Sequence, residues 1–182
     1  MMFQPLDFNQ PDVLTAFHAF LTTYMANLVR PSNIIRGWEN RSSLPPNENN
    51  YIIYSLSGAT RVGTNARSEV DKNGKFTMST MFEGRVQIDF CSDTDESRTW
   101  AAYCDSVLRS PVGPAFFKDY GFSTLYSEDL QSIEYTDGAD QYLKRTVLTV
   151  HICYTLKSTF GVEYAENVAL AKVENVDAHH KP

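Results

Sequence analysis

Asp89 and His151 are the two side chains whose types and placement could support acid–base chemistry. Each falls on the polar side of a stretch in which apolar residues alternate, so the two could meet if these stretches pair as strands. A histidine beside a carboxylate can accept a proton near neutral pH. No motif that supplies a nucleophile accompanies the pair, so a structural hydrogen bond is the favoured interpretation.

The other chemical motifs are incomplete. Gly74-Lys75 lacks the remaining residues of a phosphate-binding loop. Asp93-Thr94-Asp95 begins like a calcium loop but lacks its glycine and its closing glutamate, and acidic residues at the start of a helix explain it better. His179-His180 has no partners nearby in the sequence. We therefore expect no metal, no cofactor and no enzymatic activity.

The three cysteines, Cys91, Cys104 and Cys153, are odd in number and match no zinc or redox spacing. We expect them to be free thiols in a reducing compartment. The first residues do not form a signal peptide, and no apolar stretch reaches the length of a membrane span. The sequence thus predicts a protein without disulfides and without a membrane partner.

Composition is typical of a globular protein, with 42% hydrophobic and 21% charged residues among 182. This length suits a single domain over residues 1–182 that buries a real core. The net charge is −6, and no cluster of lysines and arginines stands out. Because phosphate neutralisation supplies much of the affinity for duplex DNA, the charge suits a conduit for DNA better than a binder.

Two helices and a further helical turn are predicted. Residues 11–29 carry an apolar stripe, with Pro11 in the first helical position and Asn9 or Gln10 as the cap. The second helix runs from Ser92 to Arg109, with Ser92 and Asp95 as a near capping box. Residues 112–120 are expected to add a short helical turn, whereas residues 31–50 are expected to be irregular.

Three stretches alternate as strands do: Tyr51 to Leu56, Lys75 to Cys91 and Lys144 to Leu156. Gly84 suggests a break or bulge in the second stretch. Asn73-Gly74 predicts a turn, so residues 57–79 should form a long hairpin arm that would be hard to stabilise alone. Residues 157–162 are expected to form a loop and residues 177–182 a flexible tail.

The predicted fold is α+β: a small, mostly antiparallel sheet with a long hairpin arm, flanked by two or three helices. Arginine, tryptophan and tyrosine often anchor interfaces, and the arm is basic on one flank. Trp38 could equally plug the end of its own core. The residues expected at interfaces with other subunits or a tube are Arg36, Trp38, Arg61, Arg67, Tyr142, Lys144 and Arg145.

Six sequence blocks, taken in order, resemble the phage neck-terminator family of head–tail connection proteins. The resemblance covers nearly the whole chain, and none of the blocks is a catalytic signature. The blocks are Leu44-Pro45-Pro46 before Tyr51-Ile52-Ile53-Tyr54, Thr60-Arg61-Val62-Gly63-Thr64-Asn65, Val86-Gln87-Ile88-Asp89-Phe90, Leu108-Arg109-Ser110, Asp140-Gln141-Tyr142-Leu143-Lys144-Arg145 and Asn175-Val176-Asp177.

This resemblance implies a structural virion protein that forms a ring, often a hexamer. Such a ring caps the head-proximal end of the tail tube and joins it to the head connector and other neck proteins. Double-stranded DNA passes through its lumen without sequence recognition. The protein is then expected in the neck of the virion, after assembly in the cytoplasm of the bacterial host.

Three other functions stay open at this point. The chain could be a head-completion or tail-tube-like subunit on a related fold. It could be a small enzyme that uses Asp89 and His151, which requires a pocket that joins the two side chains. It could also be a plain binding module without a role in assembly, which would remain a monomer at high concentration.

Overall fold

The structure is a computed structural model that describes residues 3–9, 11–37, 50–136 and 142–162. These residues form seven strands, three α-helices and a short 3-10 helix, which confirms the predicted α+β class. The elements are β1 (Phe3–Asn9), α1 (Val13–Tyr24), η1 (Pro31–Asn33), β2 (Ile34–Arg36), β3 (Tyr51–Arg67), β4 (Lys75–Ser92), α2 (Glu96–Arg109), α3 (Val112–Lys118), β5 (Phe122–Ser127), β6 (Gln131–Thr136) and β7 (Tyr142–Val162).

All described strands belong to one sheet, whose main path runs β1-β7-β4-β3-β2. The pairs are antiparallel except for β2 with β3, so the sheet is mixed. β2 lies within residues 31–50, which were predicted to be irregular. β7 organises the sheet because β4 pairs with it along one edge, while β1, β5 and β6 follow one another along the other edge.

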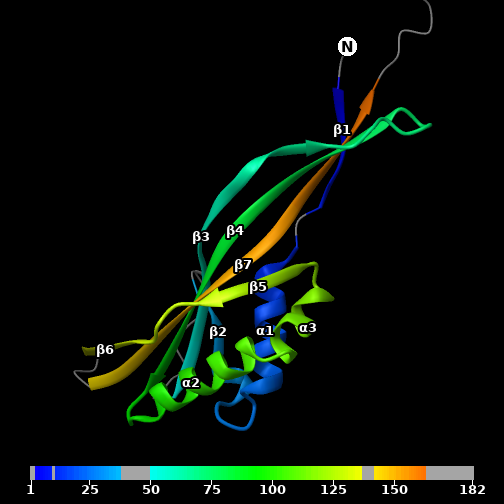
Figure 1. Ribbon diagram of the computed structural model, residues 1–182. Helices are drawn as coiled ribbons and strands as arrows, with labels where there is room; N and C mark the ends of the chain where they lie inside the picture. The colour runs from blue at the N-terminus through cyan, green and yellow to red at the C-terminus, as the bar shows by residue number, and fades with distance from the viewer. Residues whose placement is uncertain (1–2, 10, 38–49, 137–141, 163–182) are drawn as a thin grey trace, which may run out of the picture.

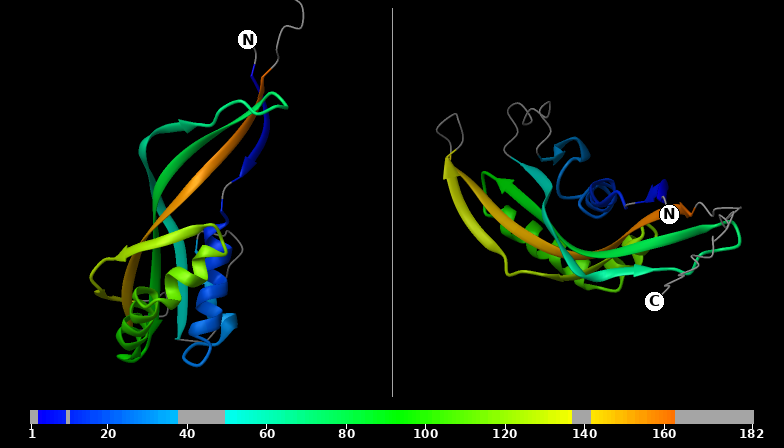
Figure 2. Two further views of the ribbon diagram at one scale, coloured as in Figure 1. Left: turned by 45° about the vertical axis from the view of Figure 1, so that its right-hand side comes forward. Right: turned by 90° about the horizontal axis from the view of Figure 1, so that it is seen from above.

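The long strands continue past the helices as an arm, which the N-terminal strand joins (Figures 1 and 2). The 18 residues of β4 extend roughly 60 Å at the usual rise per residue. At the tip, the Asp71 carboxylate accepts backbone N–H groups of Asn73 and Lys75 at 2.9 and 2.8 Å. Gly74, as the predicted turn requires, has a φ of 72°.

The arm contains further strands beside the paired β3 and β4, and one expectation is corrected. Residues 157–162 were predicted to be a loop, but they continue β7 and pair with both β1 and the first residues of β4. β1 itself was not predicted. These added strands supply the cross-strand pairs that a lone two-stranded hairpin would lack.

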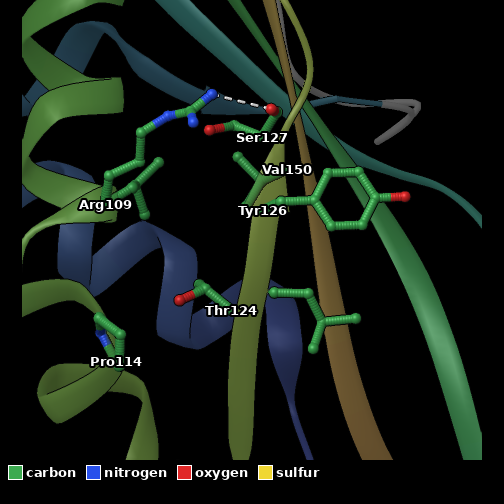
Figure 3. A pocket seen from close by; sticks show the side chains of 8 residues that line it. Arg109, Pro114, Thr124, Tyr126, Ser127 and Val150 are labelled. Atoms are coloured by element: carbon green, nitrogen blue, oxygen red, sulfur yellow. Dashed lines mark hydrogen bonds between the residues drawn. The ribbon is translucent and has the colours of Figure 1, made fainter.

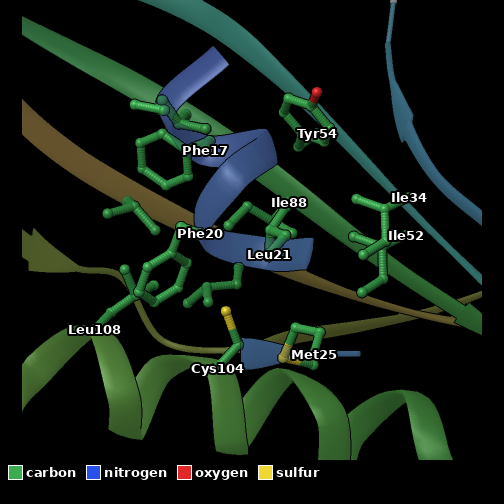
Figure 4. Close-up of a cluster of buried hydrophobic side chains, with 14 of the residues drawn as sticks. Phe17, Phe20, Leu21, Met25, Ile34, Ile52, Tyr54, Ile88, Cys104 and Leu108 are labelled. Carbon is green, nitrogen blue, oxygen red and sulfur yellow. The ribbon is translucent and has the colours of Figure 1, made fainter. Parts of the chain in front are cut away.

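One face of the sheet and the three helices enclose the main core (Figure 4). Val86, Ile88 and Phe90 are fully buried on this face, as the alternation of β4 predicted. Phe17 of α1 stacks on Phe117 of α3 with 4.7 Å between ring centroids. The opposite side of the sheet, which bears Arg85, Gln87 and Asp89, is called the polar face below.

The helix boundaries differ from the predicted ones at their first residues. α1 is capped by Asp12, whose carboxylate accepts from the backbone N–H of Thr15 at 3.1 Å and its hydroxyl at 2.7 Å. Asn9, one of the two predicted caps, belongs to β1. Ser92 is the last residue of β4, and its hydroxyl contacts Thr94 instead of forming a capping box with Asp95.

Gly84 does not bulge β4, contrary to the prediction. The register between β4 and β7 runs without a shift through the pair of Gly84 and Ile152. A Cβ at position 84 would lie 3.2 Å from side-chain atoms of both Ile152 and Tyr154. The glycine therefore leaves room for two core side chains of the neighbouring strand.

None of the helices in the described ranges is long and apolar enough to cross a membrane.

Candidate assembly surfaces

The residues predicted to lie at interfaces are distributed over three places. Arg61 and Arg67 lie on β3 in the arm, Lys144 and Arg145 near the start of β7, and Arg36 at the end of β2. Trp38 lies outside the described residues. Tyr142 is the first residue of β7 and pairs with Thr136, and its side chain lies outside the described part of the structure. These residues therefore do not form one continuous surface in the described part of the chain.

The basic side chains of the arm are exposed but held in place by neighbours. The Arg61 guanidinium donates to Asn65 Oδ1 at 2.6 Å, and this oxygen also accepts from the Thr80 hydroxyl at 2.8 Å. Arg67 lies over the ring of Phe76, 4.2 Å from its centroid, which is a cation–π contact. The arm therefore presents its positive charges in a defined arrangement.

Four exposed apolar side chains also lie on the polar face. Val62 and Met81 face each other across β3 and β4, with 44% and 46% of their surfaces exposed. Tyr126 lies opposite His151, and Ile133 lies opposite Arg145. Because residues opposite each other in a sheet point to the same side, all four apolar side chains share this face. They are spread along the face, because Val62 with Met81, Tyr126 and Ile133 lie level with residues 155, 151 and 145 of β7.

Lys144 and Arg145 already have partners within the chain. The Lys144 ammonium lies 2.5 Å from a carboxylate oxygen of Asp95, and an Arg145 nitrogen lies 2.9 Å from Asp89. Both lysine and arginine line a cavity of about 190 Å³ between α2, β6 and β7. The Arg145–Asp89 pair is the more buried of the two ion pairs. It links the neighbouring strands β4 and β7 within the sheet.

Arg36 lies beside α1 at the edge of the sheet. It lines an open cavity of about 440 Å³ together with His18 and Tyr54. Hydrogen bonds from Thr15 hold the pKa of Asp12 below its ordinary value against the opposing effect of burial, and the positive charge of Arg36 lowers this pKa by less than burial raises it. The charge of Arg36 thus makes a minor contribution at the start of α1.

Asp89 and His151 do not meet, so the predicted pairing is wrong. Asp89 accepts from Gln87 at 2.9 Å and pairs with Arg145, whereas His151 contacts Glu83 and Glu128. Asp89 lies opposite Val147, four residues from His151 along β7, a distance of about 13 Å. Within the described residues, the two side chains therefore have separate sets of partners.

The actual partners of His151 were missed in the sequence. Glu83 falls on the same alternation as Arg85 and Asp89, which is a signal that the sequence does contain. Glu128 lies between β5 and β6 and reaches His151 through the pairing of β5 with β7. No local pattern predicts that pairing.

A small groove separates α2 and α3 from β5, with a cavity of about 170 Å³ (Figure 3). Arg109 points from α2 toward β5 and donates to the backbone oxygen of Ser127 at 2.9 Å. The Ser127 hydroxyl donates to Asp105, which Arg109 also contacts. This network joins helix α2 to strand β5.

In the described ranges, no group of three or more histidine, cysteine or acidic side chains is arranged to hold a metal ion.

Comparisons with known proteins found a matching family and a similar solved structure. A sequence profile of the family described as "Phage neck terminator protein" matches residues 12–179. A solved structure described as "Virion of native gene transfer agent (GTA) particle" is similar to this chain with a TM-score of 0.33 and 15% sequence identity, over 82% of this chain and 98% of the other. A search of curated proteins found no match.

Proposed function

The chain belongs to the phage neck terminator family, and we propose that it forms a ring that closes the head-proximal end of a tail tube. As a member of this family it is a structural protein of the bacteriophage virion, at the junction of head and tail. The match over residues 12–179 is the observation that carries the proposal. In the proposed ring, the surfaces of the sheet make the contacts and no catalytic residue takes part.

The arm supports a ring because it offers surface that a monomer leaves uncovered. Val62 and Met81 are apolar and exposed on it. In the described ranges, the outer edge of β3 pairs with β2 only from Ile52 to Tyr54, so the arm part of this strand has an open edge. Open edges with exposed apolar residues pair readily with another chain. We assign this part of the arm to the contact between subunits.

The charge of the chain supports passage of DNA through the ring. Each copy carries −6, so a closed ring of several copies would be strongly acidic. An acidic lumen repels phosphates, which lets duplex DNA slide without sequence recognition. In this proposal the ring is a hexamer that assembles in the cytoplasm of the host bacterium. Its other partners are the tail tube protein and the proteins of the head connector.

Electron microscopy and mass photometry of the purified chain, alone and mixed with tail tubes, test the ring. We expect closed rings and tubes capped at one end. Met81→Glu should reduce ring formation at least tenfold because it places charge in the proposed contact. The matched control is Leu28→Glu, which changes an exposed apolar residue outside the arm and should leave rings intact. Monomers alone, with and without tubes, would refute the proposal.

Phage particles that lack the protein distinguish a terminator from a head-completion protein. A missing terminator should yield tail tubes of uncontrolled length, because nothing stops polymerisation. Full heads that leak DNA, with tails of normal length, would instead assign the protein to head completion. Either outcome is visible in negatively stained lysates.

A further inference from the structure

We propose that His151, Glu83 and Glu128 form a pH-sensitive clasp that fastens the β5–β6 edge of the sheet to its central strands. The three side chains come from β7, β4 and the segment between β5 and β6. The clasp concerns the fold of one chain and does not depend on the proposed ring.

The geometry of the clasp requires a charged histidine. His151 Nδ1 lies 2.7 Å from Glu83 Oε1, and Nε2 lies 2.8 Å from Glu128 Oε1. An ionised carboxylate can only accept hydrogen bonds, so both ring nitrogens must carry a proton. That state is the imidazolium, and its two bonds are charge-assisted. His151 is 7% exposed, so water competes little for these bonds.

Loss of the proton would break one of the two bonds. A neutral imidazole would turn a lone pair toward one carboxylate, and the two groups would repel each other. Glu83 is fixed within β4, which pairs with a strand on each side. Glu128 is tied to β7 through its backbone N–H, which donates to the Thr149 oxygen at 2.9 Å. In the described ranges β5 and β6 pair with β7 alone. The hydrogen bond between His151 and Glu128 should therefore break before the one between His151 and Glu83.

The clasp also positions an exposed aromatic ring. The register of β5 with β7 shifts between Thr124 and Tyr126, and this bulge places Tyr126 opposite His151. The two rings stack with centroids 4.2 Å apart and planes at 15°. An imidazolium attracts the face of a tyrosine ring more strongly than a neutral imidazole does. Protonation of His151 thus holds Tyr126, which is 51% exposed, on the polar face.

The groups around His151 set the pH range of the clasp. Burial disfavours the imidazolium, but the hydrogen bonds and charges of Glu128 and Glu83 outweigh burial and raise the pKa of His151 above its ordinary value. Arg85 lies opposite His151 on β4 and stays charged throughout. The other titratable groups next to His151 on this face are the Tyr126 phenol, which stacks on its ring, and the Cys153 thiol, two residues along β7. Asp89 and Arg145 lie farther along the strands on the same face and pair with each other.

The sign of the pH dependence follows from the raised pKa. A group whose pKa is higher in the folded state stabilises that state fully below its unfolded pKa, about 6.5 for histidine. This contribution is lost as the pH rises through the folded pKa. The clasp should thus be closed in mildly acidic solution and should open toward alkaline pH.

NMR titration of the histidine side chains tests the clasp in the full chain. We expect His151 to titrate above the ordinary histidine value of about 6.5, because the two carboxylates favour its charged form. Glu128→Gln and Glu83→Gln should each shift the His151 titration to lower pH. The same shift in both variants would show that the lost carboxylate causes it, because a folding defect in one variant would not be repeated in the other. A His151 titration at or below about 6.5 would overturn the proposal.

Hydrogen exchange provides the second measurement. Across the His151 titration, amide protection factors in residues 122–136 should fall severalfold with rising pH, whereas those of α1 should stay constant. His151→Gln should abolish this pH-dependent step and His18→Gln should retain it. A step that persists in His151→Gln would show that another group controls the edge and would refute the clasp.

Discussion

At the scale of single residues, the tightest steric constraint lies at Gly113, where α2 turns into α3. A Cβ at this position would lie 2.3 Å from the backbone oxygen of Leu108, far inside van der Waals contact. Backbone atoms cannot swing aside as a flexible side chain can. The turn also carries a hydrogen bond from the Gly113 N–H to the Ser110 oxygen at 3.2 Å. This glycine therefore sets how closely the two helices follow each other.

Gly113→Ala should lower the free energy of unfolding by about 1–3 kcal/mol, the usual cost of forcing extra volume into a packed site. The measurement is chemical denaturation followed by circular dichroism. Gly58→Ala is the matched control, because a Cβ there would meet only the end of the Arg85 side chain, at 3.6 Å. An equal effect of the two substitutions would show that the Leu108 contact is not the cause.

At the scale of elements, α1 depends on a cap other than the two that were predicted. Asp12 bonds both the backbone N–H and the hydroxyl of Thr15, and these bonds favour its charged form. The helix packs Phe17 and Phe20 against the sheet and α3, so its first turn helps to position the core.

Asp12→Ala should reduce the free energy of unfolding by about 1 kcal/mol at neutral pH, as loss of a helix cap does. Asp12→Asn should cost less because asparagine also caps helices. The pKa of Asp12 is lowered in the folded chain, so its charge contributes above the unfolded pKa of aspartate and is lost as the pH falls through the folded value. Denaturation at a series of pH values should show the difference between the unaltered chain and the Asp12→Asn variant shrinking in acid.

At the scale of the whole molecule, the same long strands pass from a buried body into an exposed arm (Figure 1). Val86, Ile88 and Phe90 of β4 are fully buried in the body. The arm part of β3 is exposed from Ala59 to Arg67. Local stability follows burial. The free energy of local unfolding should therefore be higher for the buried part of these strands than for the part in the arm.

Hydrogen exchange of the isolated chain should therefore show a gradient along β3 and β4. Amides of residues 86–90 should exchange with protection factors at least tenfold higher than those of residues 59–67. In rings or on tail tubes, the arm amides should gain protection if the arm contacts neighbouring subunits. Uniform protection along both strands in the isolated chain would contradict this prediction.

Local patterns in the sequence predicted the elements that alternate strongly. The buried residues of β4 and β7 follow a period of two, and a strand with that period must bury one face. α2 and the turn at Gly74 likewise follow from local chemistry. The incomplete catalytic motifs and the order of the six blocks pointed to a structural phage protein, which the family match confirms.

The tertiary structure alone decided how these elements meet. β1, β2 and the end of β7 have weak local signals, and they are strands because neighbours satisfy their backbone groups. Register decided that Asp89 pairs with Arg145 and that His151 lies between Glu83 and Glu128. Alternation within a strand indicates which face a side chain occupies. Its partner across the sheet depends on pairing between residues far apart in the chain, and no local pattern encodes that pairing.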